Sequence, residues 1–439
     1  MKISVENLGT IHKGEISLDK ELTIFTGENN SGKSYMSYLV YGVLKILDSS
    51  DDAINIIEEY AQELKLSSNL TNGIKVNFEE INSKIFNFFE DRFNSKDNTS
   101  ILVEMAFKGL QGKFLYKIEY LKLFYIAWLK NYFRDLNDKE ITFESIKYNI
   151  KFDGTSIIIT TTKYNDFLKN IIRFITYLFF NRIGLLKMYF VPAERTAINM
   201  FYNEVVGNQA EKHRKKELYT PFAPIAIEDY VFFAYDFRKH VLNPPTIFAD
   251  LATELENLLG GGVGVSAFGD LQFQPTKEAS QIPLYLTSSL VKSWSGVVIY
   301  LRHLAQEGDV LMIDEPEINL HPKTQVQIAR FLAKMVNRGI RIVVSTHSDY
   351  ILRELSTLII LNRDFEGKTD LLQRYAYQEN STLSGDKVAV YHFGNHTITN
   401  IPITNKGIET DSIDEVISQQ NEVSDMVYYS YLDTLPEEE

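Results

Sequence analysis

The stretch Gly27-Glu28-Asn29-Asn30-Ser31-Gly32-Lys33-Ser34 determines the fold that we expect for this chain. Its pattern, G-x-x-x-x-G-K-S, is that of a phosphate-binding P-loop. The two glycines let the backbone wrap closely around phosphate oxygens, so that N–H groups and the next helix N-terminus point at the anion. Lys33 adds positive charge at the β and γ phosphates, and Ser34 offers a hydroxyl to Mg²⁺. We therefore expect ATP and Mg²⁺ as ligands, with the nucleotide held by Gly27, Asn29, Asn30, Ser31, Gly32, Lys33, Ser34 and Tyr35.

The residues around this loop predict a strand, a loop and a helix. Alternating apolar residues in the first 18 positions indicate two short strands, and the apolar run 22–25 indicates a buried third strand. After the loop, apolar side chains recur at helical spacing: Met36, Leu39, Val40, Val43, Leu44 and Leu47. A P-loop requires this context, so a chance match to the pattern becomes much less probable.

The composition is that of a folded globular protein. The chain has 439 residues, of which 44% are hydrophobic and 13% aromatic, so it suits one large domain with an insertion or two domains that share a sheet. It has no cysteine, which excludes disulfides, thiolate metal sites and a catalytic thiol. The N-terminus shows no secretion signal, and the longest apolar stretch, residues 171–191, contains Arg173, Arg182 and Lys187. We expect a cytoplasmic protein with no membrane contact.

The charge balance argues against broad nucleic-acid binding. Lys plus Arg number 45 and Asp plus Glu 58, which gives a formal net charge of −13. The chain as a whole therefore repels a polyphosphate, and any DNA contact must be local. The one dense basic run, residues 212–216, is more typical of a solvated surface than of a binding site.

Two later strands end in polar residues that would complete a nucleotide site. Apolar residues 310–313 precede Asp314, which we expect to bind Mg²⁺, and Glu315, which is placed to orient or deprotonate the attacking water. Residues 341–345 predict the next strand, which leads to His347, a candidate to contact the γ-phosphate or the water. We therefore predict Glu315, His347 and Lys33 as catalytic residues, and Ser34 and Asp314 as metal ligands.

The order of patterns along the chain predicts an α/β fold in three parts. Residues 1–50 and 184–439 form one ATPase head with a mixed sheet, and residues 51–183 form a mainly helical inserted lobe with a strand pair near residues 150–162. Within the second part of the head we expect a helix that stops at Gly260, a helix from about Ser289 and a helix from about Lys323. A short helix from Ser348 and a strand at residues 357–361 should follow.

Three motifs together support a family resemblance. They are GENNSGKS at residues 27–34, IDEPEINLHP at residues 313–322 and STHSDYIL at residues 345–352. In sequence and spacing the chain resembles the ABC-type ATPases of the SMC, RecF and OLD (overcoming lysogenization defect) group. Its similarity is greatest to the AAA-family ATPases of bacterial anti-phage systems, such as PtuA-type ATPases of Septu and AriA-type ATPases of PARIS. The resemblance covers both ends of the chain and the middle only weakly.

The resemblance implies a homodimer, or a higher oligomer of dimers, with two ATP molecules between the P-loop of one subunit and a signature helix of the other. Ser289 and Lys292 stand where that signature is expected, although the segment departs from the LSGGQ form of transporter ATPases. No clear Q-loop glutamine is present, and Glu194 or Arg195 stands near its expected place. The heptads of long SMC arms are also missing.

Two functions are consistent with these features. In the first, an ATPase of anti-phage defence scaffolds or regulates a separately encoded effector, expected to be a nuclease because residues 348–439 are too short and too poor in paired acids for a TOPRIM domain. In the second, a RecF-like DNA-repair ATPase binds DNA directly, which requires a local basic face. The subunit of a membrane transporter is disfavoured by the N-terminal position of the P-loop and by the large insertion.

Overall fold

The computed structural model of the protein describes residues 1–49, 187–202, 223–266, 268–278, 280–409 and 411–432, together with five strands between residues 74 and 161.

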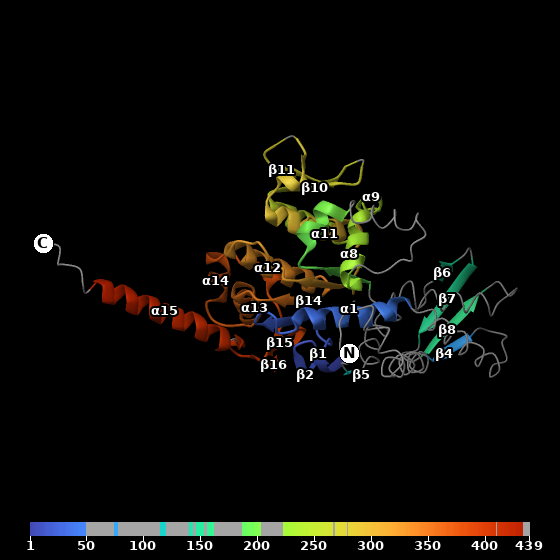
Figure 1. The fold of residues 1–439 in the computed structure, drawn as a ribbon. Helices are drawn as coiled ribbons and strands as arrows, with labels where there is room; N and C mark the ends of the chain where they lie inside the picture. Colours follow the sequence, from blue (N-terminus) through green and yellow to red (C-terminus); the bar gives the residue numbers. More distant parts are fainter. Residues whose placement is uncertain are drawn as a thin grey trace.

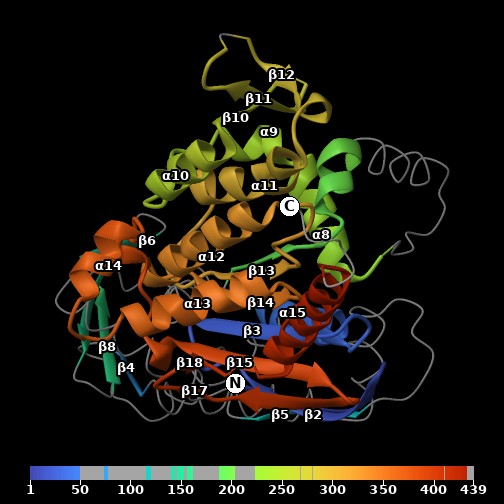
Figure 2. The ribbon, with the colours of Figure 1, turned by 90° about the vertical axis from the view of Figure 1, so that its left-hand side faces the viewer.

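A nine-stranded mixed sheet forms the centre of the molecule (Figures 1 and 2). Its strands lie in the order β5-β1-β2-β16-β15-β3-β14-β13-β9, and the five from β15 to β9 are parallel. Antiparallel pairing joins β1 to β2, β1 to β5 and β15 to β16. The strands are β1 (Lys2–Leu8), β2 (Ile11–Ser17), β3 (Leu22–Gly27), β5 (Leu115–Glu119), β9 (Met188–Val191), β13 (Val310–Asp314), β14 (Arg341–Thr346), β15 (Val388–Gly394) and β16 (Thr397–Ile401).

Three neighbouring parallel strands end at the same edge of this sheet. Strand β3 leads into the P-loop, β13 ends at Asp314 and β14 ends at Thr346. The register places Asp314 opposite Ser345, and Thr346 opposite Thr26. Ligand-facing residues gather at the carboxyl ends of strands in such sheets. The sequence prediction of an α/β fold with a mixed sheet and this arrangement of strands is confirmed.

Helices cover the parallel part of the sheet. Helix α1 (Lys33–Ser49) begins inside the P-loop and packs against β3, β14, β13 and β9, burying five of the six residues predicted at helical spacing, Met36 to Leu44. Helix α12 (Pro322–Asn337) packs against β14 and α13 (Asp349–Leu361). Strand β13 is buried along its whole length, as expected for a strand covered on both faces.

A second group of helices packs beside β9. It consists of α8 (Ile225–Tyr235), α9 (Phe237–His240), α10 (Ala249–Leu259) and α11 (Ser289–His303), with α8 against β9 and α10 against α11. Helix α10 ends where predicted, because Gly260 takes a left-handed conformation with φ of 80°. Beyond α10 and α11, at the top of Figure 1, stands a small antiparallel sheet of β10 (Gly261–Val265), β11 (Leu271–Pro275) and β12 (Ile282–Pro283).

The last part of the chain leaves the body of the molecule. After α14 (Lys368–Arg374), strands β15 and β16 and the hairpin of β17 (Ile403–Thr404) and β18 (Gly407–Ile408), the chain forms α15 (Asp411–Leu432). Figure 1 shows α15 extending away from the sheet, and residues 421–431 are exposed.

The strand predicted at residues 357–361 is wrong. These residues form the last turns of α13, whose buried side chains Leu352, Leu355, Leu358 and Ile359 follow helical spacing. The β-branched residues Thr357, Ile359 and Ile360 favoured a strand locally, and packing of the helix against α12 overrides that preference. The next segment of the chain to join the central sheet is β15.

The described residues of the predicted inserted lobe are all in strands. Strands β4 (Ile74–Asn77), β8 (Ser156–Thr161), β7 (Ile146–Phe152) and β6 (Glu140–Phe143) form a separate antiparallel sheet in that order, which confirms the strand pair near residues 150–162. Strand β5 joins the central sheet instead. The helices predicted for the rest of this lobe, and the basic run 212–216, lie outside the described residues. Within the described ranges, no helix is long and apolar enough to cross a membrane.

Candidate functional site

The P-loop closes tightly between β3 and α1. Gly27 and Gly32 take positive φ angles of 134° and 101°. A Cβ on Gly27 would lie 2.1 Å from the carbonyl oxygen of Phe393, and one on Gly32 would lie 2.6 Å from the Ile11 side chain. Only glycine fits at both positions, as a phosphate cradle requires. Asn30 also has a positive φ, and residues 28–30 are exposed at the rim.

Lys33 lies buried inside the loop. Its Nζ donates to the carbonyl oxygens of Gly27 and Glu28, at 3.1 and 2.7 Å, and to Ser31 Oγ at 3.2 Å. Burial lowers the pKa of Lys33 to about 8, against the opposing effect of nearby carboxylates. Among the described residues, the hydrogen-bond acceptors of this buried ammonium are neutral oxygens, so it suits an anionic ligand such as a phosphate.

Asp314 is buried beside Ser34, as a magnesium site requires. Ser34 Oγ donates to Asp314 Oδ2 at 3.3 Å, and Ser345 Oγ donates to Oδ1. Burial raises the pKa of Asp314 to about 6, an effect to which the nearby Glu315 and Glu194 add. A bound cation would stabilise the charged form of this buried carboxylate. Ser34 and Asp314 would hold Mg²⁺ together with phosphate oxygens and water, the usual arrangement for this ion.

Glu315 has a strained backbone. Its φ is 47°, in the left-handed region that non-glycine residues seldom adopt. Its N–H donates to the Ser345 carbonyl oxygen at 3.0 Å, and its side chain remains about one-third exposed. Strain of this kind persists only when surrounding contacts impose it, and it is frequent at active sites. This left-handed residue directly follows Asp314, the last residue of β13.

His347 lies between Glu315 and the P-loop. Its Nε2 is 3.8 Å from Glu315 Oε1, and the Gly27 carbonyl is also close to the ring. Burial lowers the pKa of His347, and the charge of Lys33 adds to this. The ring is therefore neutral at pH 7 and can accept or donate a hydrogen bond. The structure brings His347, Glu315 and Lys33 together as the sequence analysis proposed.

Glu317 is a residue of the site that the sequence analysis missed. Its Oε1 accepts from the His347 N–H at 2.6 Å and from Thr346 Oγ1 at 2.9 Å, and burial raises the pKa of this carboxyl. Its Oε2 is buried without a hydrogen-bond partner among the described residues. Glu317 therefore fixes the turn that carries His347. The sequence did contain a signal for Glu317, because it is the third acidic residue in the segment IDEPE, residues 313–317.

Ser345 was also missed. Besides contacting Asp314, its hydroxyl lies 3.3 Å from the Glu315 N–H. A serine in the strand next to Asp314 is frequent in proteins without this role, so the sequence held no specific signal for it.

The predicted signature residues occupy the first turn of α11. Ser288 is the N-cap, and its Oγ accepts from the Val291 N–H at 3.4 Å. Ser289 follows it and is exposed, while Lys292 is partly exposed. Across the described ranges, no hydrogen bond or ion pair connects either side chain with the P-loop of the same chain. Tyr35, expected at the nucleotide, packs against the β1–β2 turn, where a Cβ on Gly9 would lie 2.6 Å from its ring.

The two candidates for the Q-loop position point in different directions. Glu194 is exposed, and its charge adds to the effect of burial in raising the pKa values of Asp314 and Tyr38, so it lies near the candidate magnesium site. Arg195 is fully buried and contacts backbone carbonyls and Ser293 instead. Of the two, Glu194 is the residue able to act on bound nucleotide or metal.

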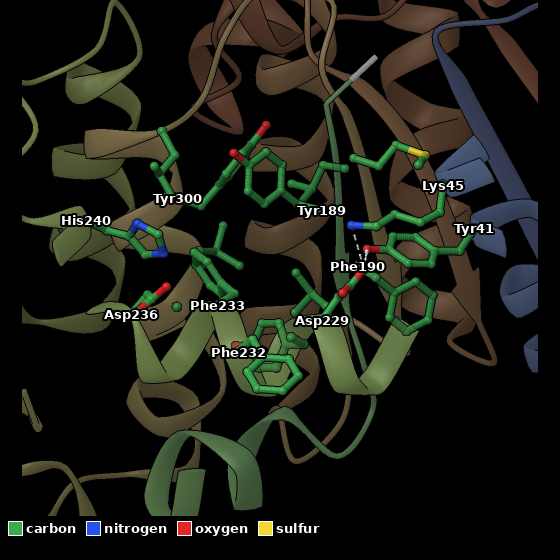
Figure 3. A pocket seen from close by; sticks show the side chains of 17 residues that line it. Tyr41, Lys45, Tyr189, Phe190, Asp229, Phe232, Phe233, Asp236, His240 and Tyr300 are labelled. Atoms are coloured by element: carbon green, nitrogen blue, oxygen red, sulfur yellow. Dashed lines mark hydrogen bonds and ion pairs between the residues drawn. The ribbon is translucent and has the colours of Figure 1, made fainter. Parts of the chain in front are cut away.

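A separate cavity of about 250 Å³ lies between α1, β9, α8 and α11 (Figure 3). Aromatic rings of Tyr189, Phe233 and Tyr300 line one part of it. In another part, Asp229 accepts from Tyr41 Oη at 2.6 Å and forms an ion pair with Lys45 at 2.9 Å (Figure 3). No P-loop residue is among the residues that line it, and its polar contacts join α1 to α8.

Comparison with known proteins identifies the family. The model of the AAA ATPase domain family matches residues 1–352. The chain belongs to this family. It is therefore an ATPase whose P-loop and Asp314 strand lie within the matched region. A search of curated proteins gave no match.

The solved structures to which the chain is similar are distant in sequence. They include the SmcHead bound to the C-winged helix domain of ScpA (10% identity, TM-score 0.33, 91% of this chain and 96% of that chain). The SMC head domain from Thermotoga maritima has 11% identity and a TM-score of 0.32, covering 92% and 98%. The protein cbiO1 from Clostridium perfringens, part of the ABC transporter complex cbiONQ, has 12% identity and a TM-score of 0.26, covering 90% and 86%. The family assignment depends on the family model alone.

Proposed function

We propose that the protein binds Mg²⁺-ATP between two copies of the chain and that the resulting dimer scaffolds or regulates a separately encoded effector nuclease in anti-phage defence. The observation that supports the dimer is the exposed first turn of α11. Ser289 begins a helix whose free N–H groups and N-terminal dipole favour a phosphate, and Lys292 adds charge. In the part of the chain that the structure describes, neither side chain forms a hydrogen bond or ion pair with its own P-loop, which supports a second copy of the chain as the source of the nucleotide.

The chemistry proposed for the site follows from its geometry. Phosphoryl transfer depends on positioning and charge stabilisation more than on covalent chemistry. Lys33 and the P-loop N–H groups would bind the phosphates, and Glu315 would orient the attacking water and accept its proton. Neutral His347, 3.8 Å from Glu315, would hydrogen-bond the water or the γ-phosphate. Mg²⁺ held by Ser34 and Asp314 would neutralise the phosphate charge.

The defence role is supported by the sequence resemblance to Septu and PARIS ATPases. The acidic character of the chain supports a protein partner over direct DNA binding, because a net charge of −13 repels a polyphosphate. Salt-sensitive binding of DNA by the purified protein alone would support the RecF-like alternative instead.

Mixing two inactive variants tests the shared site. A Ser289→Arg chain keeps an intact P-loop, and a Lys33→Ala chain keeps an intact α11. Each variant alone should lack ATPase activity, while their equimolar mixture should regain activity, at most about a quarter of the wild-type rate, because half of randomly mixed dimers have one intact site of two. Sedimentation should show dimers only with ATP. A mixture as inactive as its components would refute the shared arrangement.

A further inference from the structure

The short helix after β9 contacts the first turns of α11 at two points. Residues 195–202 are helical, and Arg195 and Asn199 lie four residues apart on the side that faces α11. Arg195 Nε donates to Ser293 Oγ at 2.6 Å. Asn199 Nδ2 donates to the Lys292 carbonyl oxygen at 2.8 Å, and Tyr230 Oη donates to Asn199 Oδ1 at 3.0 Å. These hydrogen bonds tie residues 195–202 to the N-terminal turns of α11, so that a movement of α11 would be transmitted to this short helix.

Arg195 also holds the end of β13. Its Nη1 donates to the Asp314 carbonyl oxygen at 2.8 Å and to the Pro192 carbonyl oxygen at 3.0 Å, and its Nη2 donates to the Glu315 carbonyl oxygen at 2.8 Å. The side chain is fully buried. All four acceptors are neutral oxygens, so the guanidinium bridges β13 and α11 rather than pairing with a carboxylate. Its planar fork fixes the relative positions of these acceptors.

The peptide that Arg195 holds is the strained one. Glu315 has a left-handed φ of 47°, which costs of order 1 kcal/mol or more unless surrounding contacts compensate. Its N–H is held by Ser345, and its carbonyl is held by Arg195. Loss of the second contact would free this turn, and the direction of the Glu315 side chain depends on it.

We propose that Arg195 is a positioning residue that couples α11 to Glu315 within one chain. The inference deepens the proposed function and rests on it: α11 contacts the ATP bound to the partner, whereas Glu315 acts on the ATP of its own chain. Binding of ATP at one site thereby changes the position of the catalytic carboxylate at the other site. The rigid fork cannot keep its bonds to both Ser293 and β13 if α11 moves relative to the strand. Hydrolysis at the two sites is therefore cooperative.

The substitution Ser293→Ala tests this coupling without removing the buried arginine. It deletes the contact of Arg195 with α11 and leaves the contacts with Asp314 and Glu315 available. Ser295→Ala is the matched control, because Ser295 is equally buried on the same helix but donates to the Val291 carbonyl oxygen. We expect Ser293→Ala to lower kcat about tenfold, the effect of losing one hydrogen bond to a charged donor, with ATP affinity within about twofold of wild type. The Hill coefficient for ATP should fall to about 1, and Ser295→Ala should change none of these values.

The mixed dimers separate positioning of Glu315 from support of the signature. Each mixed dimer contains one Ser289→Arg chain and one Lys33→Ala chain. Its one intact site is formed by the P-loop and Glu315 of the Ser289→Arg chain and by α11 of the Lys33→Ala chain. Ser293→Ala added to the first chain should lower turnover, and the same change in the second chain should not. The reverse result would assign Ser293 to the signature and overturn the inference.

Two other outcomes distinguish a failure of the coupling through Arg195 from a failure of the proposed function on which it rests. Non-cooperative turnover by an ATP-induced wild-type dimer would overturn the coupling alone. Absence of ATP-induced dimers would overturn the proposed function itself. Thermal melts of Ser293→Ala and Ser295→Ala establish that both remain folded.

Discussion

The substitution Asp314→Asn should stabilise the nucleotide-free protein at pH 8 while removing its response to Mg²⁺-ATP. Asp314 is almost fully buried, and its pKa is raised from 3.8 to about 6 because burial disfavours the charged form. The folded state therefore prefers the protonated carboxyl. The resulting stability is fully present below pH 3.8 and is lost as the pH rises through 6.

The size of the effect follows from the shift in pKa. A difference of about two pKa units corresponds to about 3 kcal/mol of unfolding free energy above pH 7. Asparagine cannot ionise and avoids this cost, but its contacts with Ser34 and Ser345 should be weaker by about 1 kcal/mol. We expect a net gain of about 2 kcal/mol at pH 8 and a loss of about 1 kcal/mol at pH 4.

Urea denaturation at pH 4, 6 and 8 measures this prediction, with the fluorescence of buried Trp294 as one probe. The matched control is Asp309→Asn. Burial raises the pKa of Asp309 to about 7, and this residue contacts Tyr300 and the Gln306 N–H rather than the nucleotide site. Asp309→Asn should also stabilise the protein at pH 8, and only Asp314→Asn should lose the added stability that saturating Mg²⁺-ATP gives. A destabilisation by Asp314→Asn that is equal at all three pH values would refute the reasoning.

Substitutions at three further residues test the roles of single side chains. Glu315→Gln should bind ATP normally, hydrolyse it at least about 100-fold more slowly and accumulate dimers; unchanged turnover would remove Glu315 from catalysis. His347→Ala should lower kcat at least about tenfold without weakening ATP binding by calorimetry. It should also flatten any loss of turnover below pH 6.5, because the lowered pKa of His347 places its protonation there; an unaltered pH profile would argue against this role. Glu317→Ala should lower kcat because the His347 turn loses both bonds to Oε1, whereas Glu317→Gln retains that acceptor and most of the activity; equal rates for the two variants would exclude this function.

The residues of the candidate site were predictable where their position follows from strand order. The P-loop, Asp314, Glu315 and His347 each follow a strand with an apolar pattern, and parallel strands bring their carboxyl ends to one edge. Glu317 and Ser345 could not be assigned, because their roles depend on which backbone groups face them. Arg195 was noted only by its place in the sequence. Its four bonds come from three separate segments, and no local pattern encodes such a set.

The fold was predictable where the sequence signals are local and less so where an element depends on distant contacts. The helical spacing of α1 and α11 and the glycine stop of α10 are local signals, and each was confirmed. Residues 357–361 carry β-branched side chains, so local preference favoured a strand where packing against α12 produces a helix. The position of β15 beside β3 depends on pairing between residues far apart in sequence, which periodicity does not report.

That pairing determines the order in which a newly made chain can acquire its ATP site. Strand β3 is hydrogen-bonded on one side to β14 and on the other to β15, whose register sets Leu22 opposite Val388 and Gly27 opposite Phe393. The P-loop residue Gly27 closes against the backbone carbonyl of Phe393, which the ribosome adds long after the P-loop itself. During translation, the P-loop therefore lacks this contact until β15 has been made. A nascent chain that ends before residue 388 would leave one edge of β3 unpaired, where a strand of another chain could add. We therefore expect chaperones to bind the nascent chain until β15 has been made.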